Sequence, residues 1–193
     1  QWYINSQKDE GLRSQNIEDY EDDYTKTLLT VYKAYEDICE RGGMIDFGEI
    51  LLRAHELWLQ NAQILEHYQK RFQYILVDEF QDTNSIQYAW LRVLAGDRNQ
   101  MMVVGDDDQS IYGWRGAKIE NIQKFNVDFR DADTVRLEQN YRSTSTILNA
   151  ANKLIANNRS RLGKNLWTEG SEGEQISLYE AFNEQDEARF IVD

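Results

Sequence analysis

Hydrophobic residues return every three or four positions in several stretches of the chain, which is the spacing of an amphipathic helix. This pattern predicts helices over 23–40, 47–58, 64–68, 85–93 and 143–158, and a further helical pattern over 184–193. Asp46 stands three residues before Glu49, as in a variant of the capping box that opens a helix. Asn84 or Ser85 can likewise cap the helix that begins there.

Short apolar runs lie between these helices and predict strands. The runs 74–77 and 101–104 are uninterrupted, and each ends abruptly in acidic residues. Such runs suit parallel strands that are buried on both faces. The runs 134–137 and 176–179 predict a third strand and a short fourth one. Strands that alternate with helices indicate an α/β fold with a parallel sheet.

The composition is that of a folded chain with excess negative charge. Hydrophobic residues make up 41% of the 193 residues and aromatic residues 12%, which excludes a disordered tail. The net charge of −13 argues against a general electrostatic coating of nucleic acid, but it leaves room for a local cationic groove. No apolar run reaches the roughly 18 residues of a membrane span, and no signal peptide is evident, so we expect a soluble protein that is not secreted. Cys39 is the only cysteine, which rules out an internal disulfide.

Two of the predicted strands end in acids, at Asp78-Glu79 and at Asp106-Asp107-Asp108. Ligands of open α/β sheets bind at the carboxyl ends of strands, and clustered acids repel one another unless a cation compensates them. An apolar strand followed by two acids matches the Walker B arrangement, in which the first carboxylate holds Mg²⁺ and the second can deprotonate a water. The alternative is that these acids simply begin solvated loops.

The segment 105–116 combines two kinds of chemistry on one loop. Gln109 offers an amide close to the expected metal, and Tyr112, Trp114 and Arg115 follow on a glycine-flanked stretch. Aromatic rings and guanidinium planes on loops grip single-stranded nucleic acid, at about 1–3 kcal/mol per stacked base. The alternative is that Trp114 plugs the hydrophobic core.

Three segments taken together resemble the motifs of one enzyme group. Residues 77–84 are similar to motif II of the UvrD/Rep group of superfamily 1 DNA helicases, 105–117 to its motif III and 137–143 to its motif IV. Their order and spacing agree with that group, and the resemblance runs the full length of the chain. It implies RecA-like motor domains of the P-loop NTPase type that use ATP and Mg²⁺ to move along single-stranded DNA and unwind duplexes from 3′ to 5′.

The resemblance also implies roles at an ATP site. Asp78 and Glu79 would bind Mg²⁺, and Glu79 would also activate the hydrolytic water. Gln109 would sense the γ-phosphate and relay its loss to the DNA-contacting half of its loop. Arg142, just before a predicted helix whose dipole also favours phosphate, would be an arginine finger, worth about 10³–10⁵ in rate in GTPases. Tyr141 would stack on the adenine.

Contacts with DNA are implied for a second set of residues. Tyr112, Trp114 and Arg115 would bind single-stranded DNA, and Phe47 would help to line a base pocket. The partners implied are single-stranded DNA, duplex junctions and DNA-repair proteins, with no membrane, in the bacterial cytoplasm.

The same template divides the chain into three parts. Residues 1–43 would be the end of the helical subdomain 1B, closing at the glycine pair 42–43, which marks a candidate boundary. Residues 44–136 would be the second half of the RecA-like motor domain 1A, and residues 137–193 the start of the RecA-like domain 2A.

One essential motif is missing from the sequence. The phosphate loop reads G-x-x-x-x-G-K-[ST], but the only Gly-Lys pair, at 163–164, is followed by Asn165, and Asn158 stands where the first glycine belongs. Since the chain also begins at Gln1 and breaks off within a helical pattern, we expect an internal fragment of a larger helicase. Alone, it is expected neither to hydrolyse ATP nor to unwind DNA.

Two other functions compete with this interpretation. A metal-dependent nuclease could use the acid cluster, but its core requires Asp-x-Lys or Glu-x-Lys, and neither occurs in the sequence. A non-enzymatic DNA-binding or adaptor module is the second alternative, since the aromatic loop could bind a strand without ATP.

Overall fold

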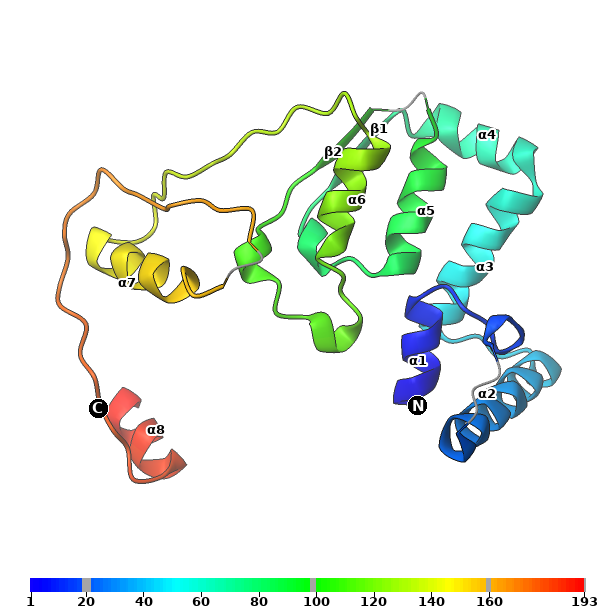
Figure 1. The fold of residues 1–193 in the computed structure, drawn as a ribbon, viewed down its shortest axis with the longest axis horizontal. Coiled ribbons are helices and arrows are strands. Elements are labelled where there is room, and N and C mark those ends of the chain that lie inside the picture. Colours follow the sequence, from blue (N-terminus) through cyan, green and yellow to red (C-terminus); the bar gives the residue numbers. More distant parts are fainter. Residues whose placement is uncertain (19–21, 98–99, 159–160, 193) are drawn as a thin grey trace. The chain divides into compact units, whose positions relative to one another are not determined.

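The chain divides into two units, residues 1–132 and residues 133–193. The structure, a computed structural model, describes residues 1–18, 22–97, 100–158 and 161–192. The first unit contains α1 (Trp2–Asp9), α2 (Asp23–Gly42), α3 (Phe47–Gln60), α4 (Ala62–Arg71), β1 (Tyr74–Val77), α5 (Ser85–Ala95), β2 (Gln100–Val103) and α6 (Glu120–Asp128) (Figure 1). It also has 3₁₀ turns at Ser14–Asn16, Phe80–Asp82, Asp107–Gln109 and Gly113–Arg115. The second unit contains α7 (Ser145–Ile155) and α8 (Glu184–Val192).

The strands β1 and β2 pair in parallel, which confirms the first two predicted strands and the α/β class. Val77 lies opposite Val103 at the carboxyl end of the pair. Backbone pairing continues beyond it, because the Val104 N–H donates to the Val77 carbonyl at 2.8 Å and the Phe80 N–H donates to the Val104 carbonyl at 2.9 Å. The residues that follow the two strands therefore emerge at the same edge of the sheet.

Helices cover one face of this sheet. Two clusters of buried residues form the core on that face: Trp58, Ile75, Leu94 and Ala95 in one, and Phe80, Tyr88 and Phe125 in the other. Successive side chains of a strand point to opposite faces. On the second face Leu76 is 75% exposed and Met102 is 59% exposed. The expectation that both faces are buried is wrong for the described residues, because α3, α5 and α6 all pack on the face that carries Ile75.

The predicted helices are present, with ends shifted by a few residues and with the expected caps. Asp46 Oδ1 accepts the Glu49 N–H at 2.7 Å and opens α3. Asn84, rather than Ser85, caps α5, and it forms a full capping box with Gln87. Among the described residues, no helix has both the length and the apolar character needed to cross a membrane.

A buried ionic cluster fastens α1 and the segment after it to α3. Glu49 is 5% exposed and pairs with Lys8 at 3.1 Å, with Arg13 at 2.9 Å and with Arg53 at 2.8 Å. Lys8 is 3% exposed and also pairs with Asp46 at 2.8 Å. Burial alone would raise the pKa of Glu49, but hydrogen bonds from Arg53, Arg13 and Lys8 outweigh it and hold the pKa below its ordinary value. The carboxylate that sequence reasoning assigned to a helix cap thus serves mainly to join helices.

The second unit contains fewer regular elements than predicted. The segments 134–137 and 176–179 are not strands. A strand needs a partner for its backbone groups, and the one bridge among the described residues of this unit joins Gln139 to Trp167. Val135 is 79% exposed and Leu178 is 97% exposed, so neither run is buried as a parallel strand would be.

Candidate functional site

The carboxyl end of β1 carries two exposed acids, Asp78 and Glu79. Glu79 has φ 50° and ψ 43°, in the left-handed region that residues other than glycine rarely adopt. The turn is held because Asp78 Oδ1 accepts the Glu79 N–H at 2.9 Å. Glu79 Oε2 in turn accepts a hydrogen bond of 2.7 Å from Gln81 Nε2. In this left-handed turn the second acid thus lies against the buried amide of Gln81.

A run of hydrogen bonds connects Glu79 with the loop that follows β2. Gln81 Oε1 accepts the Asp106 N–H at 2.9 Å, and Asp106 Oδ2 accepts a hydrogen bond of 2.8 Å from Gln109 Nε2. The structure therefore brings three predicted residues, Asp78, Glu79 and Gln109, to one edge of the sheet. Sequence reasoning assigned no role to Gln81, although it lies two residues after Glu79 within the segment that resembles motif II.

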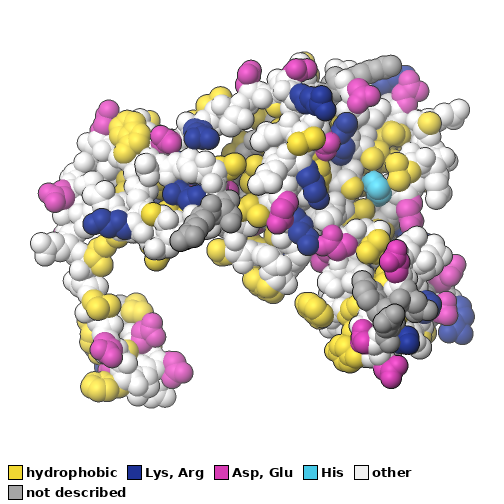
Figure 2. Space-filling view, in the orientation of Figure 1, with side chains coloured by type: hydrophobic (Ala, Val, Ile, Leu, Met, Phe, Trp, Pro, Cys, Tyr) yellow, Lys and Arg dark blue, Asp and Glu magenta, His cyan; other side chains and the backbone are white. Residues whose placement is uncertain are grey.

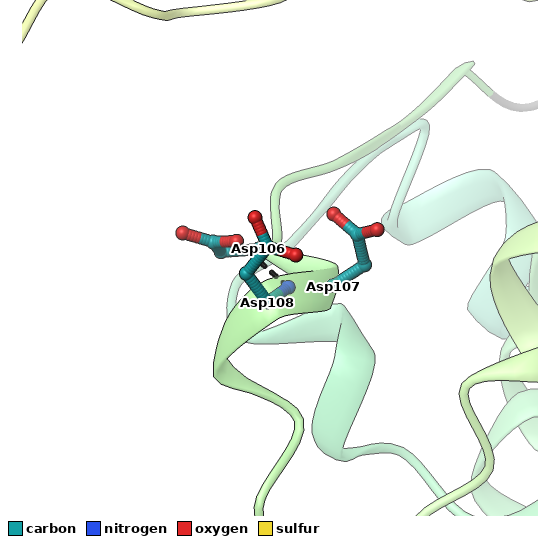
Figure 3. A group of neighbouring side chains, drawn as sticks. All are labelled: Asp106, Asp107 and Asp108. Atoms are coloured by element: carbon teal, nitrogen blue, oxygen red, sulfur yellow. Dashed lines mark hydrogen bonds between the residues drawn. The ribbon is translucent and has the colours of Figure 1, made fainter. Parts of the chain in front are cut away.

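The acids after β2 form a compact group on the 3₁₀ turn. Asp106, Asp107 and Asp108 each offer an oxygen within 4.8 Å of the others (Figure 3). Asp106 Oδ1 also accepts the Asp108 N–H at 3.0 Å and caps this turn. The pair predicted to hold Mg²⁺, Asp78 and Glu79, lies at the end of the neighbouring strand. Carboxylate oxygens are the donors that Mg²⁺ prefers, and one or two carboxylates suffice because the ion keeps waters and phosphate oxygens, so the acids present fit that ion.

The aromatic residues of the loop face solvent. Trp114 is 70% exposed, so the alternative that it plugs the core is wrong. The Arg115 guanidinium lies 4.6 Å from the Trp114 ring centroid and 5.1 Å from that of Tyr112. The Tyr112 and Trp114 ring centroids are 6.3 Å apart. The loop thus presents two rings and a cation as a group, an arrangement suited to stacking with bases.

The end of α1 and the residue after it contact the cap of α5 and the segment that follows this loop. Lys118 Nζ pairs with Glu10 Oε1 at 2.6 Å, and Asn84 Nδ2 donates to Asp9 Oδ1 at 2.8 Å. Burial raises the pKa of Asp9, although the hydrogen bond from Asn84 opposes that effect. Gly116 has φ +87°, and a Cβ there would lie 2.9 Å from Asp9 Oδ2, so this position requires glycine both for its backbone and for its space.

Phe47 is the first residue of α3 and is 92% exposed. It lines a cavity of about 720 Å³ together with residues of α1 and α2, among them Ile4 and Val31. The lining of this cavity does not include the loop 105–116. Phe47 therefore lies at a different surface site of the first unit from the loop 105–116.

Tyr141 and Arg142 belong to the second unit, in the turn before α7. Tyr141 is 86% exposed, and its hydroxyl donates to Gln139 Oε1 at 2.8 Å. The Arg142 N–H and the Ser143 N–H donate to Asn140 Oδ1 at 2.9 Å and 2.7 Å. The side chain of Asn140 thus fixes the turn that presents the exposed Arg142.

Charges of both signs are mixed on the visible face of the first unit. Figure 2 shows Lys and Arg side chains interspersed with Asp and Glu rather than gathered into one basic surface. This face therefore offers no broad electrostatic footprint for nucleic acid.

Comparison with known proteins agrees with the helicase class that the sequence motifs predicted. Residues 1–130 match the UvrD/REP helicase N-terminal domain, and residues 135–193 match the UvrD-like helicase C-terminal domain. The chain belongs to the UvrD/REP helicase family, which confirms the resemblance drawn from its motifs.

The similar relatives include DNA helicase II of Escherichia coli strain K12, which is 66% identical over 191 residues, covering 99% of this chain and 26% of the relative. DNA helicase II of Haemophilus influenzae is 62% identical over the same shares of the two chains. ATP-dependent DNA helicase PcrA of Staphylococcus aureus strain Mu50 is 48% identical over 171 residues, covering 89% of this chain and 23% of the relative. The chain thus spans about a quarter of the length of these curated relatives.

Proposed function

We propose that the chain is part of an ATP-dependent DNA helicase that couples ATP hydrolysis to translocation on single-stranded DNA and to unwinding of duplexes from 3′ to 5′, in DNA repair or replication. The names of its relatives support the enzyme class. The observation that carries the proposal is the hydrogen-bonded run from Glu79 to Gln109, because the same loop continues into the exposed rings. One loop therefore joins a candidate hydrolytic centre to a candidate DNA contact.

The proposed roles at the hydrolytic centre follow the family pattern. Asp78 binds Mg²⁺, which when bound neutralises charge on the phosphates, and Glu79 shares in holding it. Glu79 accepts the proton of the attacking water. Gln109 senses the γ-phosphate, Arg142 stabilises the transition-state charge, and Tyr141 stacks on the adenine.

DNA binding is proposed for the exposed aromatic group. Trp114 and Tyr112 stack on bases, Arg115 adds a cation next to both rings, and Phe47 contributes a base pocket at its cavity. The negative net charge of −13 and the mixed surface charges make stacking, rather than general attraction to phosphate, the main source of affinity.

The proposed domain assignment is the end of subdomain 1B for residues 1–43, the second half of RecA-like domain 1A for residues 44–136, and the start of RecA-like domain 2A for residues 137–193. Because no phosphate loop occurs in the sequence, the isolated chain is proposed to bind DNA without hydrolysing ATP. A purely DNA-binding role is thus the second candidate, favoured by the 70% exposure of Trp114.

Anisotropy of labelled oligo-dT tests DNA binding by the isolated chain. The Trp114→Ala variant should bind about 5- to 150-fold more weakly, which corresponds to the roughly 1–3 kcal/mol of one lost stacking contact. Trp167→Ala is the control, since Trp167 is 46% exposed and has no proposed role. Equal losses in the two variants, or no binding by the parent chain, would contradict the DNA contact.

Hydrolysis is tested in a complete motor. Residues 1–193 replace the matching segment of Escherichia coli DNA helicase II, and ATP turnover is measured with single-stranded DNA. Glu79→Gln should remove nearly all turnover, while Glu66→Gln, at an exposed position on α4, should retain it. The isolated chain should show only background turnover. Full activity of Glu79→Gln would refute the proposed role of that carboxylate.

A further inference from the structure

Gln81 is a polar side chain that is almost fully buried, at 1% exposure. A buried amide requires partners for both its donor and its acceptor. Its Nε2 donates to Glu79 Oε2 at 2.7 Å, and its Oε1 accepts the Asp106 N–H at 2.9 Å. The two partners come from different loops, one after β1 and one after β2. The single side chain therefore fixes the distance between the second acid of motif II and the start of the motif III loop.

The backbone of the second loop is fitted closely to this amide. A Cβ at Gly105 would lie 2.7 Å from Gln81 Oε1 and 3.3 Å from the backbone nitrogens of Gln81 and Phe80. Any side chain at position 105 would thus push against the amide. A Cβ at position 105 would therefore require the Gln81 amide to shift.

The rest of the turn is anchored independently of Gln81. Asn121 is fully buried, and its Nδ2 donates to the Thr83 carbonyl at 3.0 Å and to the Asn84 carbonyl at 3.2 Å. The Lys118 N–H also donates to the Thr83 carbonyl, at 2.9 Å. The downstream end of the turn is therefore held by the segment that leads into α6. The Glu79 carboxylate itself is exposed, and Gln81 is the buried group that holds one of its oxygens.

We propose that Gln81 is a positioning residue, which holds the Glu79 carboxylate in place for proton transfer and ties it to the loop that carries Gln109. The proposal rests on the proposed function, in which Glu79 accepts the proton of water. A movement of Asp106 would shift the Gln81 amide and with it the carboxylate, because each bond in the run is short and the amide is enclosed. Gln81 touches neither nucleotide nor DNA in this role.

The role predicts a specific kinetic signature. Gln81→Met keeps the length of the side chain but removes both hydrogen bonds, so kcat for ATP should fall about 10- to 100-fold, as expected when a proton acceptor is misplaced. The KM for ATP and the affinity for oligo-dT should stay within about twofold, since uniform binding is unchanged. Gly105→Ala should lower kcat in the same way, with Gln81 and Glu79 both intact.

The measurement uses the chimaeric helicase described above, with kcat, KM, oligo-dT affinity and melting temperature recorded for each variant. Thr83→Val is the matched control. It removes the 2.7 Å hydrogen bond from the Thr83 hydroxyl to the Phe80 carbonyl and the 3.2 Å bond that this hydroxyl accepts from Asn121 Nδ2, in the same buried turn and without touching Glu79. It should lower the melting temperature but leave kcat within about twofold. The double variant Gln81→Met/Gly105→Ala should lose no more kcat than the worse single variant, since both break one link.

Each outcome has a defined meaning. The proposal is supported if the kcat losses of Gln81→Met and Gly105→Ala coincide and do not add, while Thr83→Val retains kcat. It is overturned if kcat follows the melting temperature across all three single variants, or if only KM changes. Should Gln81→Met fail to fold, Gly105→Ala and Thr83→Val still decide the matter. Full ATP turnover by Glu79→Gln would instead refute the proposed function of Glu79 itself, and that variant is measured separately from the three above.

Discussion

Replacing Glu49 by Gln would remove the central charge of the buried ionic cluster while keeping the shape of the side chain. Its carboxylate pairs with Lys8, Arg13 and Arg53 at 3.1 Å or less. Removing one partner of a buried ion pair costs about 3–5 kcal/mol, because a charge is left uncompensated. Lys8 keeps Asp46 and Arg13 keeps Glu56, which places the expected loss near 3 kcal/mol, the lower end of that range.

Thermal and urea unfolding of the chain, followed by circular dichroism, would measure this loss. A change of about 3 kcal/mol corresponds to a fall of roughly 6–12 °C in the melting temperature for a chain of this size. The control is Glu66→Gln, which breaks a pair of the same 2.8 Å length with Lys70, but at 59% and 70% exposure. That variant should change the free energy of unfolding by less than about 1 kcal/mol.

The pH dependence gives a second readout of the same cluster. The folded pKa of Glu49 lies below its ordinary value of 4.5, so its contribution is complete above pH 4.5 and is lost as the pH falls through the folded pKa. The difference in the free energy of unfolding between the parent chain and Glu49→Gln should therefore become smaller as the pH falls. Equal losses from Glu49→Gln and Glu66→Gln, or a difference that grows in acid, would refute the reasoning.

Three further substitutions test other parts of the fold by urea unfolding. Phe80→Ala, at a side chain 2% exposed and packed edge-on against Tyr88 and Phe125, should cost about 3–5 kcal/mol, and a loss under 1 kcal/mol would contradict its place in the core. Asn84→Ala should cost about 1–2 kcal/mol through the lost cap of α5, with Ser85→Ala as the milder control. Tyr88→Phe removes the 2.6 Å hydrogen bond to Asp128 and should cost about 1 kcal/mol. Burial, helped by that bond, raises the pKa of Tyr88 above its ordinary value of 10.0. The contribution of Tyr88 to the free energy of unfolding therefore persists up to pH 10 and is lost only as the pH rises through the folded pKa. Above pH 10 the stability of Tyr88→Phe should therefore fall less steeply than that of the parent.

The sequence predicted those elements whose signal is local. Helical periodicity located α2, α3 and α7, and the cap at Asp46 was readable because its partner is three residues away. The runs 74–77 and 101–104 were recognisable as strands since each is apolar and ends in an acid. The runs 134–137 and 176–179 gave the same local signal, but a strand also needs a hydrogen-bonding partner, and the described residues of the second unit provide none for them.

The candidate site was partly predictable for a similar reason. Residue types and spacing located Asp78, Glu79 and Gln109, and the structure places them at one sheet edge. The connection through Gln81 depends on contacts between residues 25 positions apart in the chain, which no local pattern encodes. The ionic cluster around Glu49 likewise joins segments 36 positions apart and could not be read from spacing.

The left-handed backbone at Glu79 has a consequence for how variants at this position behave. A side chain held at φ 50° costs the fold roughly 1–2 kcal/mol relative to glycine, and branched residues such as valine would suffer more. A Glu79→Gly variant would relieve this cost but would leave the buried Gln81 Nε2 without its acceptor, which costs about 1–3 kcal/mol, so it should gain no stability over the parent. The acid that strains the backbone is thus also the acceptor for a buried amide, so selection for thermal stability alone would not remove it.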